Sequence, residues 1–138
     1  MRRLLLLVVF LLSGSELRAG ELKAGAFAQD ITPEKFPISV NGNFADKKAN
    51  AANDPLHARC LVLDDGTTTL AMVVVDNLGA GPEVLDEAKE IASKQTGIPT
   101  DKMLISSTHT HSGASSGTKE GGAPAGVAYH KVFVAGVA

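Results

Sequence analysis

The chain has little cysteine and few aromatic residues, and each shortage excludes a class of protein. Cys60 is the only cysteine among 138 residues, so no disulfide can form within the chain. Its apolar sequence neighbours indicate a small buried hydrophobe rather than a catalytic nucleophile. Aromatic side chains make up 4% of the sequence and tryptophan is absent. The chain therefore lacks the stacking surface with which many proteins bind single-stranded nucleic acid.

The chain also lacks an excess of positive charge and a long apolar run. Its 13 lysines and arginines are outnumbered by 15 acidic residues, which gives a net charge of −2. Because binding to nucleic-acid phosphates needs a basic surface, we expect no nucleic-acid partner. The longest apolar run covers residues 4–12 and is too short for a stable membrane span.

The N-terminal segment has the pattern of a secretory signal peptide. Arg2 and Arg3 precede the apolar run, and small residues up to Ala19 offer a cleavage site. The alternative, a buried N-terminal strand or helix, explains neither the arginines nor the abrupt change to polar residues. We therefore assign residues 1–19 to a signal peptide and expect a secreted or periplasmic protein.

Apolar periodicity predicts an α/β fold with a partial mixed sheet. Residues 22–29, 56–63 and 69–75 have the composition of strands, and an Asp-Asp-Gly turn joins the last two into a β-hairpin. An apolar stripe at helical spacing, opened by proline and closed by glycine, predicts a helix over 82–97. A short apolar strand follows at 103–107. The hairpin is therefore followed by one βαβ unit, whose two strands are parallel.

One long segment is predicted to have no regular structure, and one face of the sheet is predicted to have no covering layer. Residues 36–53 show no periodicity, and long loops of this kind are often functional or disordered. About four strands with one covering helix leave one face of the sheet open, although parallel strands are normally buried on both faces. We therefore expect an exposed apolar sheet face.

Two histidines follow the last predicted strand. His109 and His111 are two residues apart, so in an extended backbone their side chains lie on the same face. Neutral imidazole is a common zinc ligand, so the pair could hold a metal, or one could bind the metal while the other hydrogen-bonds the substrate. The alternative is a pair of polar residues in a solvated loop, and the spacing alone fits both.

The topology predicts a carboxylate beside these histidines. Parallel strands have their carboxyl ends at one edge of the sheet, where open α/β sheets bind ligands. Asp76 ends the 69–75 strand and His109 follows the 103–107 strand. Asp76 would then be a weak metal ligand or would orient a ligating histidine. The alternative is a carboxylate at the start of a loop that accepts backbone amides.

Four motifs occur together in a fixed order, and their order resembles that of a known family. They are Asp-Ile-Thr-Pro at 30–33, Asp-Pro-Leu-His-Ala-Arg at 54–59, Val-Val-Val-Asp at 73–76 and Ser-Thr-His-Thr-His-Ser at 107–112. Together they resemble the N-terminal part of the catalytic domain of the neutral/alkaline non-lysosomal ceramidase family. Members of that family are secreted or membrane-surface zinc amidohydrolases, which hydrolyse N-acylsphingosine to sphingosine and a fatty acid.

The resemblance implies roles for individual residues. His109 matches the family's zinc ligand, and His111 matches the histidine beside the metal that supports catalysis by hydrogen bonding. The implied cofactor is Zn²⁺ and the implied partner is a lipid amide substrate. Arg59 and Asp30 match recurrent positions, where we expect structural roles, such as a buried guanidinium that pairs with Asp76 or Asp30.

The resemblance also implies that this chain is the start of a larger α/β catalytic domain. Residues 20–112 would be its N-terminal part, and residues 113–138 a Gly/Ser-rich linker with the truncated start of a further helix at 129–137. The family completes its zinc site with a second histidine, a glutamate and a tyrosine much further along. We therefore expect the chain to be incomplete and inactive alone, with a non-catalytic exported remnant or binding module as the alternative. His57 and His130 are expected to be surface or core residues rather than ligands.

Overall fold

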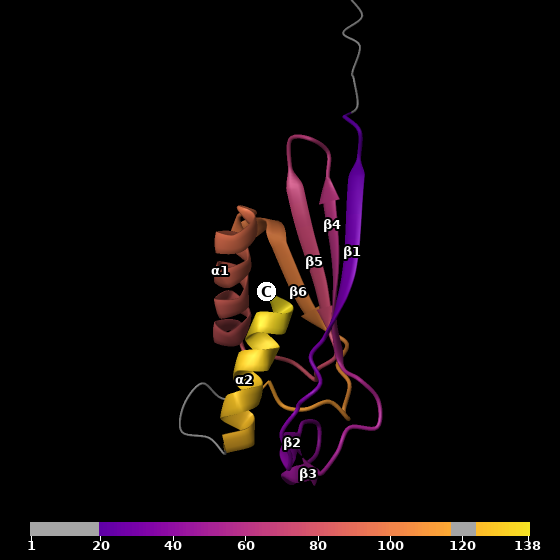
Figure 1. Ribbon diagram of the computed structural model, residues 1–138, viewed down its shortest axis with the longest axis vertical. Coiled ribbons are helices and arrows are strands. Elements are labelled where there is room, and N and C mark those ends of the chain that lie inside the picture. Colours follow the sequence, from indigo (N-terminus) through magenta and orange to yellow (C-terminus); the bar gives the residue numbers. More distant parts are fainter. Residues whose placement is uncertain (1–19, 117–123) are drawn as a thin grey trace, which may run out of the picture.

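A computed structural model describes residues 20–116 and 124–138, in which a four-stranded sheet carries two helices on one face (Figure 1). A separate two-stranded sheet lies below it. The predicted signal peptide lies outside the described residues. The elements are β1 (Lys23–Asp30), β2 (Ile38–Val40), β3 (Lys47–Ala49), β4 (His57–Asp64), β5 (Thr69–Val75), α1 (Pro82–Thr96), a 3₁₀ turn (Thr100–Lys102), β6 (Met103–Ser107) and α2 (Pro124–Val137).

The large sheet has the order β1-β4-β5-β6. β4 pairs antiparallel with both β1 and β5, whereas β5 and β6 are parallel and are joined through α1. Pro82 stands at the first position of α1, and Gly97 ends the helix in a left-handed conformation with φ 77°. The mixed sheet, the β4–β5 hairpin and the βαβ unit predicted from the sequence are therefore confirmed.

The core lies between the sheet and the two helices. Val73 and Val75 of β5 face Ala88 of α1 and the rings of Tyr129 and Phe133 of α2 in one apolar cluster. Each of these side chains is buried. Burial of this helix-facing side positions the strands, and hence the loops that leave their carboxyl ends.

Three segments differ from expectation. The stretch 36–53 contains the short antiparallel pair β2–β3 rather than loop alone. Residues 113–116 do not form a free linker, because Ala114 is 4% exposed and bridges to Val40. The final helix begins at Pro124, five residues before the expected start. The first two differences come from long-range pairing, which cannot be predicted from the sequence of three-residue strands.

The sheet face opposite the helices is open. Leu61, Leu70, Val74 and Leu104 are 38%, 41%, 41% and 61% exposed. They alternate with the buried positions along their strands, so they point away from the helices. The predicted open apolar face is thus present in the described structure. Within the described ranges, no helix is long and apolar enough to span a membrane.

Candidate metal site at the carboxyl edge of the sheet

β5 and β6 end side by side, and the candidate residues follow immediately. Val75 pairs with Ser107 at the last position of the parallel ladder, and the Thr108 amide donates to the Val75 carbonyl at 2.9 Å. Asp76 therefore leaves the sheet from the same edge as the segment that carries His109. The crossover thus brings Asp76 and the histidine segment to one edge of the sheet, as the sequence predicted.

The two imidazoles lie side by side for a different reason than the one predicted. The backbone is not extended after Ser107, because His109 adopts a left-handed conformation with φ 61°. A positive φ is uncommon for a residue other than glycine and often marks functional sites. The rings of His109 and His111 nevertheless meet edge to face, with centroids 5.0 Å apart. Alternation along a strand was the wrong mechanism, and a sharp turn brings the rings together.

Backbone carbonyls from two distant segments fix the proton on each ring. His109 Nδ1 lies 2.8 Å from the Leu78 carbonyl, and His111 Nδ1 lies 3.1 Å from the Gly42 carbonyl. Because a carbonyl oxygen only accepts hydrogen bonds, each Nδ1 must carry the proton. When such a ring is neutral, its lone pair is therefore on Nε2, and neither Nε2 has a partner among the described residues. Metal-binding histidines are held in this way by a hydrogen bond through the other ring nitrogen.

The other two histidines have their ring nitrogens engaged differently. His57 Nδ1 lies 3.4 Å from an Arg59 guanidinium nitrogen, which can only donate, so the His57 proton sits on Nε2. His130 is 5% exposed and its Nε2 lies 3.3 Å from the Glu87 carboxylate. The lone pair of His57 thus faces Arg59, and Nε2 of His130 faces Glu87.

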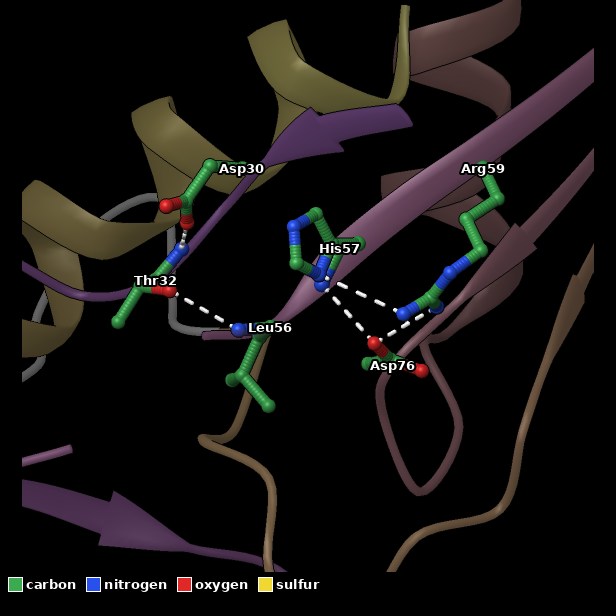
Figure 2. A network of polar contacts seen from close by, with 6 residues as sticks. All are labelled: Asp30, Thr32, Leu56, His57, Arg59 and Asp76. Carbon is green, nitrogen blue, oxygen red and sulfur yellow. Dashed lines mark hydrogen bonds and ion pairs between the residues drawn. The ribbon is translucent and has the colours of Figure 1, made fainter. Parts of the chain in front are cut away.

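Asp76 contacts an arginine and a backbone amide rather than a histidine ring. Figure 2 shows its carboxylate between His57 and Arg59. Oδ2 accepts a 2.8 Å hydrogen bond from the Arg59 guanidinium and a 3.0 Å bond from the His57 amide. No hydrogen bond joins Asp76 to His109 or His111 in the described structure. The contact with the His57 amide agrees with the alternative interpretation, in which Asp76 is a loop-start carboxylate that accepts backbone amides. A role of Asp76 towards a metal stays a prediction.

The expected pairing of Arg59 with Asp76 is present, but the guanidinium is not buried. The Arg59 side chain is 50% exposed, whereas that of Asp76 is 18% exposed. Exposed ion pairs contribute little because water screens them. The pair therefore links the start of β4 to the end of β5 and contributes little to the stability of the fold.

A second set of polar contacts holds the end of β1 (Figure 2). The Asp30 carboxylate accepts the Thr32 amide at 2.8 Å, which is the predicted turn. Hydrogen bonds from the Thr32 hydroxyl and then from its amide lower the Asp30 pKa. The Thr32 hydroxyl then accepts the Leu56 amide at 2.9 Å. These contacts fix the chain where it enters the β2–β3 pair, which carries Gly42.

Sequence reasoning missed two residues that hold the histidine loop. Gly42 has φ 90°, and a Cβ on it would lie 2.5 Å from His111 Nδ1. Asn77 is fully buried, and its amide nitrogen donates to the Ala114 carbonyl at 2.8 Å while its oxygen accepts the Gly79 amide. The Asn-Gly pair at Gly42 was a detectable turn signal. The partners of Asn77, in contrast, are set only by the fold.

A pocket of about 330 Å³ opens beside His111. Phe36, Ile38 and Leu56 form an apolar wall, and lysines of β3 lie at its polar side. This volume is within the lower range of small-molecule pockets. The site thus combines a pair of imidazole lone pairs with an adjoining apolar recess.

The donor set fits a zinc site in part. Imidazole nitrogen is a preferred zinc ligand, and zinc usually takes four ligands. Within residues 20–116 and 124–138, no group of three or more His, Cys, Asp or Glu side chains could hold a metal ion. The described residues therefore supply at most part of such a site.

Solved ceramidase structures share this fold. Neutral ceramidase from Pseudomonas aeruginosa matches 84% of this chain with a TM-score of 0.71 and 19% sequence identity. A ceramidase in complex with C2 matches the same share with a TM-score of 0.66 and 21% identity. The chain spans about one fifth of each of those chains, since the match covers 20% of their length. No family model and no curated protein sequence matches the chain.

Proposed function

We propose that this chain is the N-terminal portion of an exported, zinc-dependent amidohydrolase of the neutral ceramidase type, and that His109 binds the zinc. One observation carries the proposal. His109 and His111 both hold a proton on Nδ1 against a backbone carbonyl, so that the lone pair of each neutral ring is on Nε2, and the two ring centroids lie 5.0 Å apart. Neutral imidazole in this tautomer is the form that binds zinc. The fold shared with neutral ceramidase supports the same conclusion.

The two histidines have different roles in this proposal. Bound zinc would polarise the amide carbonyl and activate water for hydrolysis. His109 Nε2 contributes a metal ligand, and the Leu78 carbonyl holds the ring in place. His111 is the catalytic residue, because its Nε2 can hydrogen-bond the substrate or move a proton at the reacting amide. The apolar wall of the adjoining pocket supports a lipid amide such as N-acylsphingosine as the substrate.

The site needs further ligands. In our proposal they come from other parts of a complete domain, and the chain alone binds zinc weakly and does not turn over substrate. Asp76 would influence the site from its position at the same edge, through the Arg59 pair and the His57 amide. The N-terminal sequence pattern supports export, which adding the natural leader to a reporter enzyme would test.

Histidine NMR tests the proposal without relying on activity. Long-range ¹H–¹⁵N spectra of the metal-free chain should show His109 and His111 as Nδ1-protonated tautomers and His57 as the Nε2-protonated one. Added zinc should then shift the Nε2 signal of His109 first. His109→Ala should abolish the zinc response, whereas the matched control His57→Ala should retain it.

Two outcomes would contradict the proposal. One is a His109 ring that is protonated on Nε2. Its lone pair would then be on Nδ1, against the Leu78 carbonyl, and could not bind zinc. The other is a zinc response that survives His109→Ala or that first affects His130. No response up to millimolar zinc would favour the alternative, a non-catalytic exported remnant or binding module.

A further inference from the structure

A second cavity lies between the sheet and the helices, away from the histidine edge. It has a volume of about 220 Å³ and is lined by residues of β1, β4, β5, β6, α1 and the end of α2. Met103 at the start of β6 and Ile98 before it belong to this lining, so the cavity reaches toward the edge opposite His109. The proposed hydrolytic site does not use it.

The lining of this cavity is mostly aliphatic, and Gln29 and Thr96 add two neutral polar side chains. Val62, Val73 and Ile105 are typical of its strand side, and Ala92 is typical of its helix side. Lys89 of α1 is the single charged side chain in the lining. Lys89 is half-buried and has no ion-pair partner in the described part of the chain. An apolar recess with one unpaired cation is complementary to an aliphatic chain that ends in one negative charge.

We propose that this cavity binds a free fatty acid, with its alkyl chain among the aliphatic side chains and its carboxylate on Lys89. The attraction comes from burial of methylene groups, and Lys89 selects the anionic head. Each buried methylene is worth about 0.8 kcal/mol, which corresponds to about a fourfold gain in affinity. The gain should stop once the chain fills the cavity.

Cys60 is a built-in reporter for this cavity. Its side chain belongs to the lining, and it is the only thiol in the protein. Burial raises the pKa of the Cys60 thiol, so its reaction with a neutral reagent is slow at neutral pH. A ligand in the cavity should slow this reaction further. A ligand on the open sheet face should not, because Cys60 lies on the helix-facing side.

The experiment measures the rate at which N-ethylmaleimide labels Cys60 in the full metal-free chain. Hexanoate, octanoate and decanoate, each below its micelle concentration, should protect Cys60 with affinities that rise about fourfold per methylene. Octanol should protect more weakly than octanoate. Lys89→Gln should lower the affinity for octanoate about three- to fivefold and leave the affinity for octanol unchanged, since a partly exposed ion pair contributes modestly to binding.

Matched variants separate this site from others. Lys94→Gln removes an exposed lysine of the same helix that does not line the cavity, and it should leave octanoate binding unchanged. Leu104→Lys disrupts the open face and should also have no effect. Ala92→Leu fills the cavity and should abolish protection by octanoate and octanol alike. Circular dichroism of each variant checks that it folds.

Several results would overturn the inference. One is that octanoate does not protect Cys60. Another is that Lys89→Gln weakens the binding of octanoate and of octanol equally. A third is that Cys60 is protected only in the presence of anionic lipid vesicles. His109→Ala should not change octanoate binding, so a failure here leaves the zinc proposal standing. Conversely, failure of zinc binding leaves this cavity unaffected.

Discussion

Gly42 determines where the His111 ring can lie. Its carbonyl accepts the hydrogen bond that fixes the Nδ1 proton of His111, and its backbone has φ 90°. A Cβ at this position would lie 2.5 Å from Nδ1 and 2.9 Å from the His111 Cβ. Because the contact is with the near part of the ring, a small rotation of the side chain cannot relieve it. The tautomer of His111 and the position of its Nε2 therefore depend on glycine at position 42, which has no Cβ.

Gly42→Ala should move His111 without unfolding the protein. We expect the His111 ring signals to shift in the NMR spectrum and its Nδ1 proton to exchange faster with solvent. The zinc response of His109 should weaken, because the paired ring no longer lies beside it. Titration of the variant followed through both rings measures these effects.

Gly66→Ala separates steric displacement from backbone strain. Gly66 also has a positive φ of 84°, but a Cβ there meets nothing within 4 Å. Both variants place alanine in a left-handed backbone, which costs about 1–2 kcal/mol, but only Gly42→Ala should disturb His111. If both variants change the histidine spectrum equally, the proposed contact is not what positions the ring.

At the same scale, the sequence predicted the two candidate histidines but not the groups that hold them. His109 and His111 were recognisable from a local motif. The carbonyls that fix their protons lie 31 and 69 residues away in sequence. No local pattern encodes such pairings, because they depend on how the β2–β3 pair and the loop after β5 fold against the histidine segment. The extended backbone assumed for this segment failed for the same reason.

Among the elements, the β4–β5 turn carries a carboxylate whose pKa is lowered by backbone hydrogen bonds. Asp65 Oδ1 accepts the amides of Thr67 and Thr68 at 2.8 Å each. These hydrogen bonds hold the Asp65 pKa below its ordinary value of 3.8. A carboxyl group whose folded pKa is lowered stabilises the fold above its unfolded pKa. That contribution is lost as the pH falls through the lower, folded pKa.

Acid should therefore weaken this hairpin below about pH 4, and Asp65→Asn should remove part of the effect. We expect the urea midpoint of the wild-type chain to fall more steeply between pH 5 and pH 3 than that of the variant. Asp86→Asn, on the exposed side of α1, is the control and should follow the wild type. Parallel curves for the wild type and Asp65→Asn would show that the turn hydrogen bonds do not contribute.

Elements with strong periodicity were predictable and short ones were not. The strands of the large sheet and α1 were located because burial on one side or both sides imposes a pattern over several residues. β2 and β3 have three residues each, and β3 includes two adjacent lysines. Their pairing is stabilised partly by contacts with the histidine loop, such as the bridge between Val40 and Ala114. These contacts also place residues 113–116 in the core rather than in a linker.

At the scale of the whole molecule, one face of the sheet is closed by the helices and the other is open. Val73 and Val74 are neighbours on β5 and point to opposite faces. Val73 is 8% exposed beneath the helices, whereas Val74 is 41% exposed on the open face. The match covers 20% of each ceramidase chain, so in those structures this fold is one part of a larger arrangement. An open apolar face of this kind favours binding to another protein surface or self-association.

The same substitution on the two faces should therefore give different results. Val73→Thr places a hydroxyl in the core and should lower the free energy of unfolding by about 1–3 kcal/mol. Val74→Thr should change it by less than about 0.5 kcal/mol, because water already reaches this position. Val74→Thr combined with Leu104→Lys should also reduce binding of an apolar dye and self-association in size-exclusion chromatography. If Val74→Thr destabilised the chain as much as Val73→Thr, the second face would be covered in solution, and a dimer through that face would explain the loss. A concentration-dependent unfolding midpoint distinguishes that case, because only an assembly gains stability by mass action.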